Sequence, residues 1–160
     1  AAPIAHTGSI TGIAGRKDFT VLALEKALMN TQIGFGRRLL SVLESNQVSF
    51  EHMPSGIDTM SVVIADVQLD NKLDRVLAQI RSECEPDALE VYPRMALIAT
   101  VGRGMPRTPG IAARLFGALA DAEINIRMID QGSSEINIIV GVETSDFERA
   151  MRAIYQAFVT

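Results

Sequence analysis

The sequence predicts an α+β protein built from two similar small domains, each an antiparallel sheet with two helices on one face. Three observations predict this fold class. The chain repeats itself at a constant offset of 76 residues, which separates Gly34 from Gly110 and Leu43 from Leu119. Each copy places an amphipathic helix between runs of β-branched and apolar residues. A length of 160 residues, 48% of them hydrophobic, is enough for two small domains with modest cores.

The first strand of each copy is predicted at "FTVLAL" (19–24) and "MALIAT" (95–100), which coincide at the offset of 76 residues. A helix and a second strand follow in both copies. At this offset the run "GFGRRLLSVLESNQVSF" (34–50) falls on residues 110–126 of "PGIAARLFGALADAEINI" (109–126), and both indicate a glycine-started amphipathic helix that leads into a strand. The constant offset excludes insertions or deletions within this segment.

A third strand and a second helix complete each copy. The strands are predicted at "TMSVVIAD" (59–66) and "EINIIVGV" (135–142), each after a loop with a glycine at the same place. Each following helix has a single apolar stripe. The stripes consist of Leu73, Val76, Leu77 and Ile80 in the first copy and of Phe147, Met151, Ile154 and Phe158 in the second.

The last strand of each sheet predicts an interleaved chain. In the first copy "ALEVY" (88–92) follows the second helix, whereas no such run follows it in the second copy. The run "SITGIAG" (9–15) can form a strand and is left unused by the first copy. We therefore expect a first domain at 16–92, inserted into a second domain made of 9–15 plus 93–160. Both follow the ferredoxin-like βαββαβ plan.

Composition and charge exclude several classes of function. The net charge is −4 with a pI of about 5.2, and aromatic residues make up 5% of the chain without any Trp, so no nucleic-acid partner is expected. Cys84 is the single cysteine, which excludes an internal disulfide and fits a reducing cytosol. No run approaches the roughly 20 apolar residues of a membrane span, and the N-terminus lacks signal-peptide features. The sequence predicts a cytoplasmic chain without membrane contact.

The loop "VGRGMPRTPG" (101–110) resembles a nucleotide-binding loop only superficially. Arg107 occupies the place of the third glycine of a dinucleotide fingerprint, and the Gly-Lys-Ser/Thr ending of a phosphate loop is missing. Helix initiation explains the loop: Thr108 is predicted as the N-cap, Pro109 as the first helical residue and Gly110 as a point of close packing.

A small carboxylate ligand is the functional alternative for these helix starts. Free backbone N–H groups there attract anions, and glycines mark both helix starts, Gly34 with Gly36 and Gly110 with Gly104 nearby. The next strand is expected to face such a ligand, with outward residues Ser49, Glu51, Asn125 and Arg127 if Val48, Phe50, Ile124 and Ile126 alternate inward.

Charge distinguishes the two copies at this strand. Glu51 can accept an ammonium group, which makes the first copy a candidate amino-acid site, and Arg127 cannot. The alternative is that both are merely solvated strand residues. We predict no catalytic residue and no metal site, because His6, His52 and Cys84 form no cluster. His52 is expected to be structural or solvent-facing, and Arg37, Arg38 and Arg114 to form polar helix faces.

These residues resemble the tandem ACT domains that form the regulatory C-terminal part of aspartate kinase. The first domain is similar over "IGFGRRLLSVLESNQVSFEHMPSGIDTMSVVI" (33–64) and the second over "ALIATVGRGMPRTPGIAARLFGALADAEINIRMIDQGSSEINIIV" (96–140), above all at "GIAARLF", "INIRMI" and "SSEINI". The run "ITGIAGRKDFTVLAL" (10–24) resembles the beginning of the regulatory region.

The resemblance implies a non-catalytic regulatory region that binds lysine or threonine, pairs into homodimers and mediates feedback inhibition of ATP-dependent aspartate phosphorylation. ATP and Mg²⁺ are then expected only at a kinase domain outside these 160 residues. Carried over by position, the effector-binding residues are Met29, Gln32, Gly34, Phe35, Gly36, Ser49, Phe50 and Glu51. A second candidate effector site comprises Pro109, Gly110, Ile111, Asn125 and Ile126.

The identity of the effector stays open at this point. Glu51 agrees with lysine-sensitive relatives, but Gln32 replaces a small hydroxyl residue and "PSGID" (54–58) replaces a run richer in Thr, Ser and Glu. Two other functions compete with amino-acid sensing: a ligand-free dimerisation module, and an ACT region of another amino-acid enzyme such as homoserine dehydrogenase or a mutase.

Overall fold

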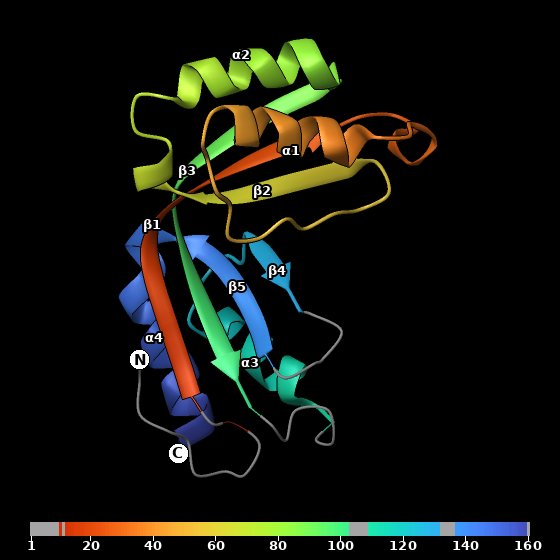
Figure 1. Cartoon of the computed structure of the whole chain (residues 1–160). Helices are drawn as coiled ribbons and strands as arrows, with labels where there is room; N and C mark the ends of the chain where they lie inside the picture. The colour runs from red at the N-terminus through yellow and green to blue at the C-terminus, as the bar shows by residue number, and fades with distance from the viewer. Residues whose placement is uncertain (1–9, 11, 103–108, 132–136, 160) are drawn as a thin grey trace. The chain divides into compact units, whose positions relative to one another are not determined.

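A computed structural model of the chain describes residues 10, 12–102, 109–131 and 137–159 (Figure 1). The chain divides into two compact units. One consists of residues 19–93, and the other combines the residues up to 18 with residues 94–160.

Two long strands contribute to both units. Strand β1 (Gly12–Glu25) passes from one unit to the other after Asp18, and strand β3 (Ala88–Val101) passes back after Pro93. Both crossing points carry a residue with a left-handed backbone, Asp18 with a φ of 71° and Arg94 with a φ of 57°. Each long strand was predicted as two separate runs, and each is continuous.

The sheet of the 19–93 unit contains the second half of β1, the first half of β3 and strand β2 (Thr59–Ala65). Strand β1 lies between β2 and β3. It runs antiparallel to β2, with Phe19 opposite Ala65 and Glu25 opposite Thr59.

Two helices cover one face of this sheet, α1 (Phe35–Ser45) and α2 (Leu73–Cys84), and they pack against each other (Figure 1). Short 3-10 turns, η1 (Met29–Thr31) and η2 (Asp66–Gln68), follow β1 and β2. The predicted stripe of α2 is buried except for Leu73, which is only partly covered. The core of the unit is formed by alternate strand residues and by the helix stripes, including Leu22, Leu24, Val62, Ile64, Leu39, Leu43, Val76 and Ile80.

The segment after α1 forms only part of the strand predicted there. Its pairing with β2 begins at Glu51, whose N–H donates to the Val63 carbonyl at 2.8 Å, while the Val63 N–H donates to the His52 carbonyl at 2.9 Å. Val48 is buried as expected, but Phe50 is 40% exposed, so its predicted inward orientation is wrong. Phe50 precedes the first paired residue and therefore is not held in the pleat.

The second unit contains β5 (Asn137–Glu143), β4 (Met128–Asp130) and the remaining halves of β1 and β3. Strand β3 lies between β1 and β5, and β4 is on the outer side of β5. The pairs β3–β5 and β4–β5 are antiparallel, with Met95 opposite Glu143. The fold class is therefore α+β with antiparallel sheets, as predicted.

Helices α3 (Ile111–Asp121) and α4 (Phe147–Val159), the latter preceded by the turn η4 (Thr144–Asp146), pack together on one side of these strands (Figure 1). Ile10 and Ile13 are 1% and 2% exposed and belong to the same core as Ile154 and Phe158. The N-terminal run thus packs in this unit. The predicted domain limits, 16–92 and 9–15 plus 93–160, stay a prediction, and truncation tests it.

Both first helices of the repeat begin at a glycine in the left-handed region, Gly34 with a φ of 86° and Gly110 with a φ of 89°. This corrects the predicted start of α3. The N-cap is Gly110, Pro109 precedes the helix, and Thr108 lies outside the described residues. A Cβ atom on Gly110 would meet open space, so the glycine is required by its φ and not by close packing. None of the described helices combines the length and apolarity of a membrane span.

Candidate functional site

The connection from β1 to α1, residues 26–34, contains the first group of predicted site residues and is called the β1–α1 loop below. Met29 lies in η1 and is 5% exposed, so its side chain belongs to the core and is not presented to a ligand. Gln32 ends η1, and its Oε1 accepts a hydrogen bond from Arg38 Nη2 at 3.3 Å. Of these two predicted site residues, Met29 is therefore covered by the core and Gln32 is bonded to Arg38.

The first turn of α1 supplies N–H donors. The Phe35 N–H donates to the Gln32 carbonyl at 3.3 Å and the Arg38 N–H to the Gly34 carbonyl at 2.9 Å. Among the described residues, no acceptor is found for the backbone N–H groups of Gly36 and Arg37. These donors lie at the positive end of the helix dipole, which favours a carboxylate. Phe35 itself is 3% exposed and packs into the core.

The strand-edge residues of the predicted site follow α1. Ser49 is exposed, and its N–H donates to Gln68 Oε1 at 3.2 Å, while Glu51 is exposed and is held by its backbone to β2. Strand β2 connects this edge to the helix start: a Cβ on Gly36 would contact Met60 Cε at 3.6 Å, and Val63 pairs with Glu51. Met60 and Val63 are three residues apart, which is ~10 Å along a strand.

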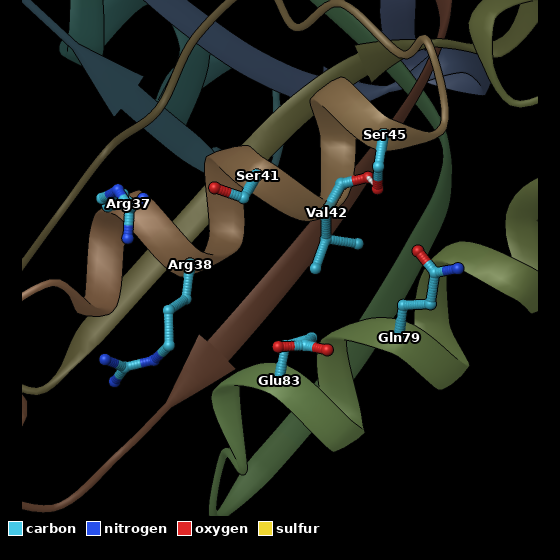
Figure 2. Close-up of a pocket in the computed structure, with 7 residues that line it drawn as sticks. All are labelled: Arg37, Arg38, Ser41, Val42, Ser45, Gln79 and Glu83. Carbon is cyan, nitrogen blue, oxygen red and sulfur yellow. Dashed lines mark hydrogen bonds between the residues drawn. The ribbon is translucent and has the colours of Figure 1, made fainter.

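A polar groove lies between α1 and α2 and was not predicted (Figure 2). It has a volume of about 440 Å³ and is lined by Arg37, Arg38, Ser41, Val42 and Ser45 of α1 and by Gln79 and Glu83 of α2. Arg38 extends from the groove to the β1–α1 loop, where Nη1 donates to the Ile33 carbonyl at 3.3 Å and Nη2 to Gln32. Arg38 was predicted only to lie on the polar face of the helix, but it also links the helix to the β1–α1 loop.

Cys84 ends α2 near this groove. Burial raises the pKa of its thiol, and the positive charge of Arg38 offsets part of that rise. Cys84 is 2% exposed, so its side chain belongs to the core of the 19–93 unit.

The second candidate site differs from the first in its charges. Pro109, Gly110 and Asn125 are exposed, Ile126 is half-buried and Ile111 is buried; Gly104 lies outside the described residues. Arg127, at the position of Glu51, pairs with Glu143 of β5 with 3.0 Å between Nη1 and Oε1. The same offset places the uncharged Val67 at the position of Glu143 in the first copy. The Arg127–Glu143 pair of the second copy is therefore not repeated by the residues at the same positions of the first copy.

Metal-ligating and catalytic clusters were not expected. Across the described residues, no group of three or more His, Cys, Asp and Glu side chains is arranged to hold a metal ion. His52 is half-exposed and bridges to Val63, and His6 lies outside the described residues.

Comparison with known proteins defines the class of these units. A model of the ACT domain matches residues 98–158. Aspartokinase 3 of Bacillus subtilis is 40% identical over 152 residues, which cover 94% of this chain and 34% of that protein.

Solved structures extend the likeness to both units. The crystal structure of Clostridium acetobutylicum aspartate kinase, described as an allosteric enzyme, is 60% identical with a TM-score of 0.90 and covers 94% of this chain and 35% of its own. Aspartokinase III of E. coli, solved with lysine and aspartate, shares the fold at 22% identity and a TM-score of 0.77, over 94% of this chain and 33% of its own. Residues 98–158 match an ACT domain, and the chain as a whole is similar to aspartate kinases, of whose length it spans about a third.

Proposed function

We propose that this chain is the amino-acid-sensing region of an aspartate kinase and mediates feedback inhibition of ATP-dependent aspartate phosphorylation by lysine, with threonine as the second candidate effector. In this proposal the catalysis, ATP and Mg²⁺ belong to a kinase domain, and the whole protein acts in the cytoplasm. Effector binding shifts the population of two conformations of the regulatory region, which is the usual basis of allosteric inhibition.

The proposal rests on two kinds of group in the 19–93 unit, backbone N–H donors at a helix start and a carboxylate on the neighbouring strand edge. The N–H groups of Gly36 and Arg37 can receive the α-carboxylate of an amino acid, and Glu51 on the adjacent edge can receive an ammonium group. The complex of E. coli aspartokinase III with lysine supports lysine as that amino acid. At the corresponding position of the other unit, Arg127 would repel the same ammonium group.

Calorimetric titration with lysine and with threonine tests this assignment in the wild type, Glu51→Gln and Arg127→Gln. Glu51→Gln keeps the shape of the side chain and deletes its charge, and Arg127→Gln is the matched control in the other unit. A charge-assisted hydrogen bond is worth roughly 1.5–3 kcal/mol, so Glu51→Gln should weaken lysine binding about tenfold to a hundredfold. Equal lysine affinity in all three proteins would exclude Glu51 as the ammonium partner, and heat from threonine alone would reassign the effector.

We further propose that the chain forms a homodimer through its ACT units. Unpaired sheet edges need cover, and Phe50, 40% exposed, lies at the outer segment of the 19–93 unit. Sedimentation velocity should show a dimer. A monomer at concentrations far above micromolar, with or without lysine and threonine, contradicts this part of the proposal.

A further inference from the structure

The β1–α1 loop is fastened at its start by a charged group from the connection between α2 and β3. The Ala27 N–H donates to Asp87 Oδ2 at 2.7 Å, and the Asp87 N–H donates back to the Glu25 carbonyl at 2.8 Å. Lys26 lies beside this pair: its Nζ donates to the Glu85 carbonyl at 2.7 Å and is 4.0 Å from Asp87 Oδ1. In Figure 1 the loop leaves β1 at the end of the sheet where α2 gives way to β3.

A second aspartate fastens the loop from the side of β2. The Lys26 N–H donates to the Asp58 carbonyl at 2.9 Å, and the Met29 N–H approaches Asp58 Oδ1 at 3.3 Å. Lys26, Asp58 and Asp87 together are called the loop clasp. Its two carboxylates come from segments that are distant in the sequence, and both accept hydrogen bonds from loop backbone.

The residue held between these two bonds has an unusual backbone. Leu28 has a φ of 58° and a ψ of 35°, in the left-handed region that a leucine rarely adopts, and its side chain is 66% exposed. Buried packing of the leucine side chain therefore does not impose this conformation. The N–H groups of its two neighbours, Ala27 and Met29, are the ones that Asp87 and Asp58 accept. A strained backbone persists only where its surroundings determine it. Here the bonds to Asp87 and Asp58 act together with the local turn, in which the Met29 N–H also donates to the Lys26 carbonyl at 3.1 Å.

The loop leads directly into the groups that would bind an effector. Met29 begins η1, the Gln32 carbonyl at the end of η1 accepts the Phe35 N–H, and Gly34 caps α1. If the bond between Ala27 and Asp87 is lost, the backbone of the loop can change its path just before the start of α1. At the position of Lys26 the other unit has Gly102, which has no side chain, so the clasp cannot be repeated there in the same form.

We propose that Asp87, with Lys26, is a positioning residue that holds the β1–α1 loop in its binding-competent form and so sets the effector affinity of the 19–93 unit. This inference rests on the proposed function and adds to it the residues that regulate the site. Neither residue is expected to touch the effector. A loop that is competent only about one tenth of the time raises the apparent Kd about tenfold, without loss of any ligand contact.

Lysine titrations of the full chain in four forms test the inference: wild type, Asp87→Ala, Asp87→Asn and Val76→Ala. Asp87→Ala removes the acceptor of the Ala27 N–H and should raise the Kd for lysine about tenfold. Asp87→Asn keeps an oxygen that accepts this bond and should recover most of the affinity. Val76 is buried at the far end of α2, so Val76→Ala is the control that lowers stability without touching the loop.

Amide hydrogen exchange of the ligand-free protein gives a readout independent of lysine. Ala27 should exchange faster in Asp87→Ala relative to the wild type, but not in Val76→Ala. Unchanged exchange at Ala27, unchanged lysine affinity in Asp87→Ala, or an equal loss of affinity in Val76→Ala would each overturn the inference and leave the proposed function standing. Absence of lysine and threonine binding in the wild type would instead overturn the proposed function, and the inference with it.

Discussion

Two glycines of the same helix should respond in opposite directions to the same substitution. Gly110 caps α3 with a φ of 89°, and Gly117 lies on the exposed side of the helix interior without a positive φ. A Cβ atom at either position would meet nothing within 4 Å. Replacement by alanine therefore changes backbone preference and leaves side-chain packing untouched at both places.

The expected magnitudes follow from the two backbone conformations. Alanine in the left-handed region costs roughly 1–2 kcal/mol, and the reduced entropy of the unfolded chain offsets about 0.4–1 kcal/mol of that. Gly110→Ala should therefore lower the free energy of unfolding by about 1 kcal/mol. In a helix interior alanine is favoured over glycine by about 0.8–1.0 kcal/mol, so Gly117→Ala should raise the free energy of unfolding by about that amount.

Urea unfolding followed by circular dichroism measures both changes, and thermal unfolding should show midpoint shifts of about 4–8 °C in opposite directions for a unit of this size. Gly34→Ala provides a parallel in the other unit, because Gly34 has a φ of 86° and a Cβ there would meet only Arg38 Nη1 at an ordinary 3.6 Å. Changes of the same sign at Gly110 and Gly117 would refute the argument that φ, and not space, selects the capping glycine.

Two further predictions concern the unit that contains the N-terminal run. A chain that starts at Lys17 loses Ile10 and Ile13, which are 1% and 2% exposed, and should lose about 3 kcal/mol or more from the stability of that unit; full stability of both units in this truncation would contradict the interleaved topology. The hydrogen bond from Lys17 lowers the pKa of the Glu148 carboxyl below its ordinary value. Stability from this pair is then present above the ordinary glutamate pKa and is lost as the pH falls through the lowered one. An NMR titration should find a higher Glu148 pKa in Lys17→Met than in the wild type, and an unchanged pKa would exclude Lys17 as the main cause of the lowering.

The parts of the fold that depend on periodicity were predictable from the sequence. The stripes of α2 and α4 point Val76, Ile80, Ile154 and Phe158 into the two cores, because one face of a helix recurs every three to four residues. The alternation of inward and outward residues gave a wrong orientation for Phe50, because a residue follows the pleat of a sheet only where it is paired with a neighbouring strand. Pairing is a tertiary property that no local pattern of residues encodes.

The glycines of the candidate site were predictable from the sequence, but the hydrogen bonds that hold the loop beside them were not. A glycine at a helix start is a local signal, and Gly34 and Gly110 were found by it. The bond from Ala27 to Asp87 joins residues that are far apart in the sequence and follow no repeat, so only the folded chain brings them together. Likewise, Arg38 was expected on a polar helix face, and its bonds to Gln32 and Ile33 depend on the course of the preceding loop.

The division of β1 and β3 between the two units has a consequence for synthesis on the ribosome. The 19–93 unit is continuous in the chain and is complete as soon as residue 93 has emerged, whereas the partners of Ile10 and Ile13 extend to Phe158. At about 5–20 residues per second, the two isoleucines wait roughly 3 to 13 s longer for the rest of their core. During this interval Ile10 and Ile13 lack the core residues that cover them in the finished chain. The segment around Ile10 and Ile13 is therefore the part of the nascent chain whose exposed apolar residues a chaperone would shield.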